Sequence, residues 1–377
     1  MISNRIYLDF NASTPIAPEV AEAMRPFLSQ HFGNPSSHHW AGEPARGAVE
    51  YARKQVADLL QCHPEEIVFT SGGSESNNHA IKGIFYALKG KENHIITTQI
   101  EHPAVLNPCR FLEKLGAEVT YITVDQYGRV DPDDIEKAIT PKTILITVMH
   151  ANNEVGTIQS IKDISKIAKK YGIIFHTDAA QSVGKIDTKV NDLGVDLLSL
   201  AGHKVYAAKG VGALYIRKGT PIEPLIHGAG HESGRRAGTE NVLLIVGLGK
   251  ACEIAKKYLR NDKARDLRDR FEGLLQENFG DKVVFNGHPI HRLPNTLNIS
   301  FVGKVGGEIL SRLDGVAAST GAACHSGSVE LSPVLKAMRI SPEVGMGAIR
   351  FSLGRTTTLQ ELERVIKLLK DTLPSNL

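Results

Sequence analysis

The chain has 377 residues, of which 42% are hydrophobic and 23% are charged, and its 44 Lys and Arg against 41 Asp and Glu leave a formal charge of +3. A chain of this length exceeds one compact unit, so two domains are expected. The charges are nearly balanced and form no basic run, so charge gives no support to binding of nucleic acid or of a membrane surface.

The N-terminus and the cysteines indicate a cytoplasmic protein. Residues 1–15, MISNRIYLDFNASTP, lack the basic and apolar regions of a secretory signal peptide. No apolar run approaches the ~18 residues of a membrane-spanning helix. The four cysteines, at positions 62, 109, 252 and 324, are scattered without a CxxC spacing. This pattern is typical of a reducing compartment and argues against a disulfide framework or a zinc site.

Strand-like and helix-like segments alternate through the first two thirds of the chain. Amphipathic segments, such as 47–60 and 161–172, lie between short apolar strands predicted at 66–70, 94–98, 143–149, 173–178, 196–202 and 211–216. This alternation predicts an α/β fold with a mainly parallel sheet covered by helices on both faces. Ligands of such sheets bind at the carboxyl ends of the strands.

The pattern changes after a long helical stretch from about 240 to 278. Residues 282 to 372 combine further short strands with helices, which predicts a smaller α/β domain. We place the boundary near residue 258. Residues 16–258 would form the large domain, and residues 1–15 and 259–377 the small one.

Three predicted strand ends carry polar side chains. The segment FTSGGSESNN runs from a strand through glycines to Ser74, where free N–H groups at a helix start suit a phosphate, although Ser74 also suits a helix N-cap. No Lys-Ser/Thr pair follows these glycines, so this is not a Walker A loop. Asp178 closes a second strand and Lys204 follows a third; taken singly, the first is typical of a helix N-cap and the second of a solvated surface.

Together these groups match the needs of pyridoxal phosphate (PLP). This cofactor requires a lysine that binds it covalently, a carboxylate that keeps its pyridine nitrogen protonated, and a cradle for its phosphate. Lys204, Asp178 and Ser74 supply one group of each kind. The sequence therefore predicts a PLP site at the carboxyl edge of the sheet.

Ten segments in order then resemble the cysteine desulfurases, which are fold-type I, class V aminotransferase-like PLP enzymes. They are YLDFNASTP, GNPSSHHWAG, FTSGGSESNN, IEHPAV, ANNEVGTIQ, HTDAAQSVGK, GHKVYAAKGVGALYIR, RRAGTEN, LPNTLNISF and IRFSLGRTTT. The resemblance covers about residues 5 to 370. It implies a large domain with a mainly parallel central sheet flanked by helices, a smaller C-terminal α/β domain that carries the catalytic cysteine, and a homodimer.

The resemblance also implies roles for single residues. Those at the cofactor are the covalently bound lysine Lys204, the ring-stacking His102, Asp178 at the pyridine nitrogen, Gln181 at the ring hydroxyl, Gly73, Ser74 and His203 at the phosphate, and Thr239 contributed by the other subunit. Asn153 and Arg350 would bind the substrate carboxylate, a task that suits a guanidinium because it grips a carboxylate with two hydrogen bonds.

Cys324 stands in STGAACHSGS, a stretch of small residues that suits an accessible thiol better than a core. It matches the cysteine that becomes a persulfide in this family. In the implied reaction L-cysteine displaces Lys204, which serves as proton shuttle with His102 as helper. The Cys324 thiolate attacks the substrate sulfur, L-alanine leaves, and a sulfur acceptor such as an iron–sulfur scaffold protein collects the persulfide. The other three cysteines match no motif and are expected in packing.

Two departures from the family leave the substrate open. Ala201 stands where many members have a phosphate-binding Ser, and this change, the CHS at Cys324 and GTENV resemble the selenocysteine lyases. The segment from Cys324 to PVL, in contrast, has the length of the desulfurases. Alternatives are therefore L-selenocysteine as substrate, a class V aminotransferase, and a PLP-binding protein without turnover. The histidine pairs in SHHW and HGAGH are not expected to bind a metal. Glycines between His227 and His231 make a helical i, i+4 pair improbable, and no Glu follows the first His.

Overall fold

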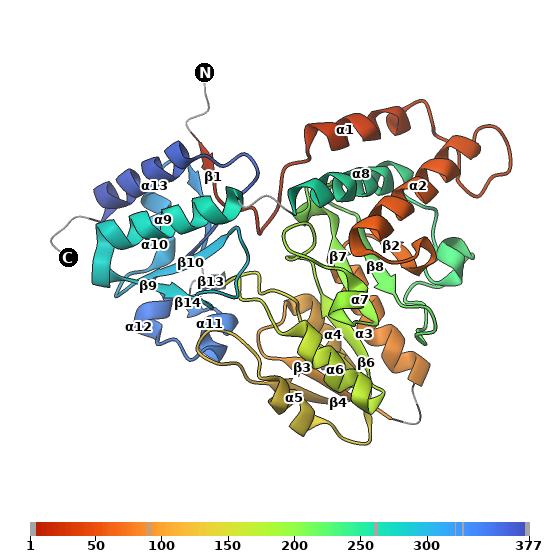
Figure 1. The fold of residues 1–377 in the computed structure, drawn as a ribbon, viewed down its shortest axis with the longest axis horizontal. Coiled ribbons are helices and arrows are strands. Elements are labelled where there is room, and N and C mark those ends of the chain that lie inside the picture. Colours follow the sequence, from red (N-terminus) through yellow and green to blue (C-terminus); the bar gives the residue numbers. More distant parts are fainter. Residues whose placement is uncertain are drawn as a thin grey trace.

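The computed structural model describes residues 5–88, 90, 92–259, 263–320, 322–325 and 328–373, with the backbone alone for residues 322–325, 328 and 329. Two lobes lie side by side, one around a large sheet and one around a small sheet (Figure 1). No helix within the described ranges is long and apolar enough to cross a membrane.

The large sheet has seven strands in the order β2-β8-β7-β6-β5-β3-β4. Their bounds are β2 (Ile67–Thr70), β3 (His94–Thr98), β4 (Glu118–Ile122), β5 (Thr143–Thr147), β6 (Ile174–Asp178), β7 (Leu197–Ala201) and β8 (Gly212–Ile216). Strands β4, β3, β5, β6 and β7 pair in parallel, and β8 is antiparallel to both β7 and β2. The predicted mainly parallel sheet is thus confirmed.

Helices cover both faces of this sheet. They are α1 (Pro18–Met24), α2 (Glu43–Leu60), α3 (Gly73–Leu88), α4 (Pro103–Glu113), α5 (Pro132–Ala138), α6 (Ile161–Tyr171), α7 (Val190–Leu193) and α8 (Val242–Tyr258), with 3₁₀ turns η1 (Arg25–Leu28), η2 (Pro64–Glu66), η3 (Gly202–Lys204) and η4 (His231–Gly234). Successive strand residues point to opposite faces, so Ile96 joins a core with α2, α6 and α8 while Ile95 joins a core with α3 and α4. Strands buried on both faces explain the continuous apolar runs in the sequence.

The helix α6 shows how the sequence sets these elements. Ile161, Ile164 and Ala168 are buried at helical spacing and face the core, whereas lysines occupy its solvent side. The helix ends at Gly172, whose φ of 67° is a left-handed conformation that glycine adopts without strain. The loop that follows leads into β6 and so toward the strand end at Asp178.

The second lobe contains an antiparallel sheet in the order β12-β15-β10-β9. Its elements are α9 (Lys263–Phe279), η5 (Gly280–Lys282), β9 (Val283–Asn286), β10 (Thr296–Phe301), α10 (Gly306–Arg312), β11 (Val316–Ala317), β12 (Ser319–Thr320), β13 (Ala322–His325), β14 (Ser328–Leu331), α11 (Pro333–Ala337), α12 (Pro342–Gly345), β15 (Ala348–Ser352) and α13 (Leu359–Thr372). The N-terminal β1 (Ile6–Tyr7) pairs in parallel with β11, and β13 pairs with β14.

Most buried residues of the two lobes fall in separate cores, although Val334, Leu335 and Met338 of the second lobe pack with the core of the first. Ile6 and Leu8 pack with Phe271, Phe351 and other residues of the second lobe, far in sequence from the N-terminus. The helical stretch predicted from 240 to 278 is in fact two helices, since α8 ends at Tyr258 and α9 begins at Lys263. The domain boundary near residue 258 stays a proposal, which this division of core residues supports.

Candidate active site

A cavity of about 330 Å³ opens at the carboxyl ends of β6 and β7 and extends to β15 of the second lobe. All the predicted site residues except Thr239 and Cys324 line it: Gly73, Ser74, His102, Asn153, Asp178, Gln181, His203, Lys204 and Arg350. They come from segments that are distant in sequence, and the parallel strands bring them to one edge. Asn11, Asn77 and Ala201 also line the cavity.

Two backbone carbonyl oxygens accept hydrogen bonds from the amine of Lys204. Its Nζ donates to the carbonyl oxygen of Asn11 at 2.5 Å and to that of Ala12 at 2.9 Å. Burial and, to a lesser extent, the Arg350 charge lower the pKa of Lys204 to about 8, although the nearby carboxylates of Asp178 and Asp9 oppose the change. A substantial fraction of this amine is therefore neutral near physiological pH, which is the form that attacks a carbonyl carbon.

Asp178 is a buried carboxylate, 6% exposed, that is held by two hydrogen bonds. Its Oδ2 accepts from Asn77 Nδ2 at 2.7 Å and its Oδ1 accepts from the backbone N–H of Ala180 at 2.9 Å. None of the residues that the structure describes forms an ion pair with it. A buried carboxylate without a cation fits a protonated ring nitrogen in the cavity.

The N-terminus of α3, where the phosphate cradle is predicted, lies at the cavity wall. A Cβ atom on Gly73 would lie 3.2 Å from the Cβ of Ala201, so a side chain here would crowd the cavity wall. The first N–H groups of a helix lack intrahelical partners and attract anions. Arg236 forms an ion pair with Glu75 in the first turn of this helix, with Nε–Oε1 at 2.8 Å and Nη2–Oε2 at 3.2 Å. The sequence analysis did not single out Arg236.

Two histidines of the cavity are neutral at physiological pH. His102 caps α4, where its Nδ1 accepts from the backbone N–H of Ala104 at 3.1 Å. Burial lowers its pKa, with the Asp178 carboxylate opposing this change and the Lys204 charge adding to it. Burial and neighbouring lysines lower the pKa of His203 to about 4. Its Nδ1 lies 3.4 Å from Ser13 Oγ. A neutral imidazole is suited to stack on a ring or to hydrogen-bond a phosphate oxygen without adding charge.

Asn11 links the two lobes at this site and was missed by the sequence analysis, although it belongs to the quoted YLDFNASTP. It is fully buried, and its backbone carbonyl accepts from Gln181 Nε2 at 2.9 Å as well as from Lys204. Its Oδ1 accepts from Lys185 Nζ and Asn295 Nδ2, each at 3.1 Å. The position of the Lys204 amine therefore depends on contacts from both lobes.

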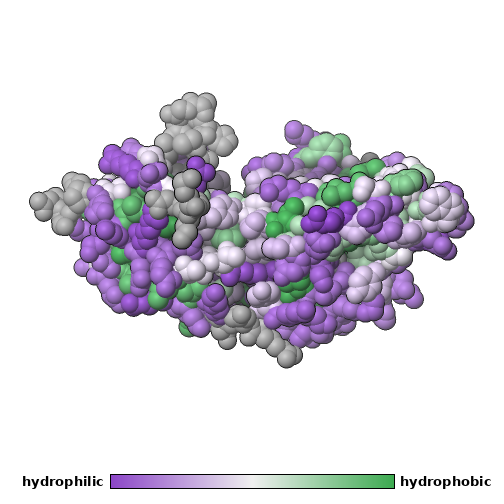
Figure 2. Space-filling model, turned by 90° about the horizontal axis from the view of Figure 1, so that it is seen from above, coloured by the Kyte–Doolittle hydropathy of each residue, from purple (hydrophilic) through white to green (hydrophobic). Residues whose placement is uncertain are grey.

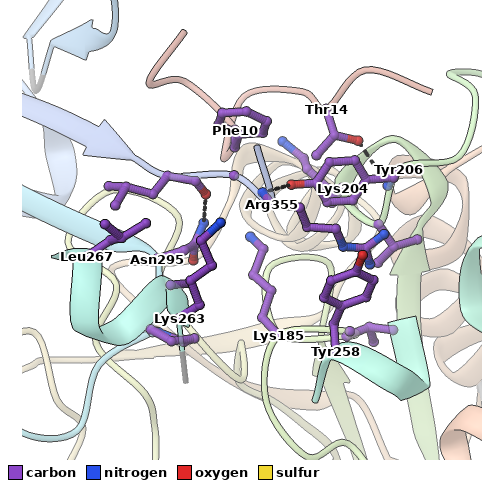
Figure 3. Close-up of a pocket in the computed structure, with 17 residues that line it drawn as sticks. Phe10, Thr14, Lys185, Lys204, Tyr206, Tyr258, Lys263, Leu267, Asn295 and Arg355 are labelled. Carbon is purple, nitrogen blue, oxygen red and sulfur yellow. Dashed lines mark hydrogen bonds between the residues drawn. The ribbon is translucent and has the colours of Figure 1, made fainter. Parts of the chain in front are cut away.

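A second cavity lies beside Lys204, and Figure 3 shows Lys204, Lys185 and Arg355 around it. Its cations have partners already. Lys185 donates to Asn11 Oδ1 and to Gln181 Oε1, and its pKa is lowered well below the ordinary value, mainly by burial. The Arg355 guanidinium lies 4.1 Å from the ring centre of Tyr206 and 4.3 Å from that of Tyr258. These contacts hold Lys185 and Arg355 in place beside Lys204.

Two predicted site residues do not meet the others. Thr239 lines a separate cavity of about 240 Å³ with Ser71 and Arg236, and it is not among the described residues that line the first cavity. Cys324 lies in β13, opposite Val329 of β14, and its side chain falls outside the described residues. Two of the other cysteines, Cys109 and Cys252, are buried in the cores, where burial raises their pKa to about 12.

Comparison with known proteins assigns this chain to a family. The family model for class-V aminotransferases matches residues 6–365. The chain is 52% identical to the cysteine desulfurase IscS of Dictyoglomus turgidum over 373 residues, which cover 98% of this chain and 94% of that protein. It is 50% identical to the IscS of Methanosarcina thermophila over 371 residues, or 97% and 91% of the two chains.

Solved structures agree with these relatives. A NifS-like protein superposes with a TM-score of 0.92 at 39% identity, covering 97% of this chain and 98% of that chain. SspA in complex with cysteine superposes with a TM-score of 0.83 at 42% identity, over 92% and 98%. The chain belongs to the class-V aminotransferase family and, within it, to the cysteine desulfurases.

Proposed function

We propose that the protein is a PLP-dependent cysteine desulfurase that converts L-cysteine to L-alanine and leaves a persulfide on Cys324. One observation carries the proposal: an amine with a pKa of about 8, on Lys204, shares a cavity with the buried Asp178 carboxylate and the Arg350 guanidinium. The curated relatives, named cysteine desulfurases, support the choice of reaction.

The residues of the cavity fit the cofactor. Lys204 would bind PLP covalently, and Asp178 would pair with its pyridine nitrogen. The remaining cofactor contacts would be His102 on the ring face, Gln181 at the ring hydroxyl, and Gly73, Ser74 and His203 at the phosphate. When bound, PLP supplies an electron sink that stabilises negative charge at the substrate Cα.

Lys204 then acts as the base. Its free amine would remove the substrate Cα proton, because its lowered pKa leaves it partly neutral. The carbonyl oxygens of Asn11 and Ala12 lie where they accept the protonated amine. His102, neutral and at the cavity wall, would assist this transfer.

The substrate carboxylate would bind Arg350 and Asn153. The Cys324 thiolate would attack the substrate sulfur, and the new S–S bond would hold the sulfur as a persulfide. The electron pair of the broken C–S bond would stay on the substrate Cβ, which takes up a proton to become the methyl group of L-alanine. A solved relative is described in complex with cysteine, which supports this substrate class. Ala201 at the phosphate side keeps L-selenocysteine as a second candidate substrate, since this residue is part of the resemblance to selenocysteine lyases.

The partners are part of the proposal. Thr239 would reach the active site of a second subunit, and exposed Leu28, Phe32, Trp40 and Tyr51 offer apolar area for a homodimer. Figure 2, which views the molecule from the side of α1 and α8, shows hydrophobic residues among polar ones on this lobe. The sulfur acceptor would be a protein such as an iron–sulfur scaffold, and the location would be cytoplasmic.

The test measures alanine and sulfide release from L-cysteine by the PLP-loaded protein, with L-selenocysteine in parallel. Lys204→Ala should abolish turnover and the PLP absorbance that depends on a covalent bond to lysine. Lys166→Ala, at an exposed surface pair with Asp163, should change neither. A Lys204→Ala protein with wild-type turnover would refute the proposal, and turnover confined to L-selenocysteine would favour the lyase.

A further inference from the structure

Arg350 already holds a carboxylate in this structure. Its Nη2 donates to Asp9 Oδ1 at 2.6 Å and to Ser319 Oγ at 2.9 Å, and its Nη1 donates to the Asn153 carbonyl oxygen at 2.9 Å. Ser319 Oγ also donates to Asp9 Oδ1 at 2.9 Å. The side chains of Arg350 and Asp9 are 10% and 18% exposed, so solvent screens the pair only in part.

The donors of Arg350 are limited in number. A guanidinium has five N–H bonds and grips a carboxylate with two hydrogen bonds either through Nη1 and Nη2 or through Nε and Nη2. Both arrangements use a hydrogen on Nη2, and Asp9 and Ser319 take both of these. Nε has no partner among the described residues. A substrate carboxylate can therefore bind with two hydrogen bonds only after one of the present acceptors leaves.

We propose that Asp9 is the internal competitor of the substrate carboxylate at Arg350, so that Asp9 sets the affinity for substrate and product. This inference rests on the proposed function. Asp9 is the acceptor that leaves, because two carboxylates on one guanidinium repel each other. The neutral Ser319 hydroxyl does not repel the substrate carboxylate and can stay in place.

The backbone keeps Asp9 close by. Asp9 bridges to Ser352, two residues after Arg350 on β15, so its carboxylate stays at a high local concentration when displaced. Its return to Arg350 helps to expel the carboxylate of L-alanine. Asp9 is thus a positioning residue for Arg350 that weakens ground-state binding and speeds product release.

The experiment uses the full-length, PLP-loaded protein without turnover. L-alanine and ethylamine, which lacks a carboxylate, are titrated against wild type, Asp9→Asn and Ser319→Ala, with binding followed by PLP absorbance and calorimetry. Asp9→Asn keeps the shape and removes the competing charge, so the Kd for L-alanine should fall by about tenfold. The Kd for ethylamine should change less than about twofold, because ethylamine does not use Arg350.

Controls separate the possible outcomes. Ser319→Ala frees one Nη2 hydrogen but keeps the Asp9 charge, so it should change the preference for L-alanine over ethylamine much less than Asp9→Asn does. Asp163→Asn, the same substitution at a surface ion pair, should leave both constants unchanged. If Asp9→Asn fails to fold, Asp9→Ser removes the same charge and carries the same expectation.

Weaker or unchanged L-alanine binding in a folded Asp9 variant, or an equal change for both ligands, would overturn this inference. A wild-type protein that gives no spectral response to L-alanine would instead count against the proposed function.

Discussion

Asn77 donates its side-chain amide to the Asp178 carboxylate at 2.7 Å, inside the sheet edge where both residues are buried. Asn77→Ala should leave Asp178 Oδ2 without this donor and let the carboxylate turn away from the cofactor. We expect the Kd for PLP to rise by about tenfold, since a buried hydrogen bond to a charged group contributes about 1.5–3 kcal/mol. Equilibrium dialysis of the apoprotein against PLP measures this change. Asn107→Ala, at an exposed position of α4, is the matched control, and equal PLP binding by both variants would contradict the role.

The strand ends of this site are predictable from sequence, because parallel apolar strands bring the residues that follow them to one edge. Asp178, Lys204 and the α3 start meet in this way. Contacts such as Asn11 with Thr296, separated by 285 positions, leave no local pattern. A single polar residue in a motif does not reveal its distant partner, and Asp9 was missed for the same reason.

The sequence analysis also missed one strand and one helix boundary, for physical reasons. The edge strand β4 is only partly buried and lacks a continuous apolar run, so EVTYI gave a weak signal. The helices α8 and α9 follow each other so closely that their periodic patterns merge. Both cases are decided by tertiary packing rather than by local sequence.

The pKa of Lys204 predicts a pH dependence for cofactor capture. Burial lowers this pKa from 10.5 to about 8, so the amine is mostly protonated at pH 7 and mostly neutral at pH 9. The neutral amine is the nucleophile, and the rate of PLP capture by the apoprotein should therefore rise with pH around a midpoint near 8. Stopped-flow absorbance between pH 6 and 10 measures the rate. A midpoint near 10.5 would mean that the site does not perturb Lys204.

Gly73 offers a test of the phosphate cradle. A methyl group there would lie 3.2 Å from the Ala201 Cβ. Gly73→Ala should therefore reduce the space in the cavity and weaken PLP binding several-fold. Gly47 in α2 has no atom within 4 Å of the same added group. Gly47→Ala should leave PLP binding intact and stabilise the fold by roughly 0.5–1 kcal/mol. Dialysis measures the PLP affinity of both variants, and urea unfolding measures their stability. An unchanged PLP affinity in Gly73→Ala would show that Gly73 is not part of the phosphate cradle.

The proposed homodimer predicts sensitivity at the exposed apolar residues. Trp40 is 79% exposed and Phe32 is 77% exposed in the single chain. Replacing both with Asp should shift the mass seen by light scattering from twice 41.0 kDa toward 41.0 kDa. The double substitution at Tyr127 and Ile290, also exposed apolar residues, serves as control. A wild-type protein that is an active monomer would end the dimer proposal.

The central claim is that sulfur passes from L-cysteine to Cys324. Mass spectrometry of peptides from the wild-type protein, taken after brief exposure to L-cysteine, should show added sulfur on Cys324 and none on Cys62, Cys109 or Cys252, whose thiols have a pKa raised to about 12 by burial. Cys324→Ala should keep PLP and its spectral response to L-cysteine while alanine formation collapses. Full alanine production by Cys324→Ala, or added sulfur on another cysteine alone, would contradict the account.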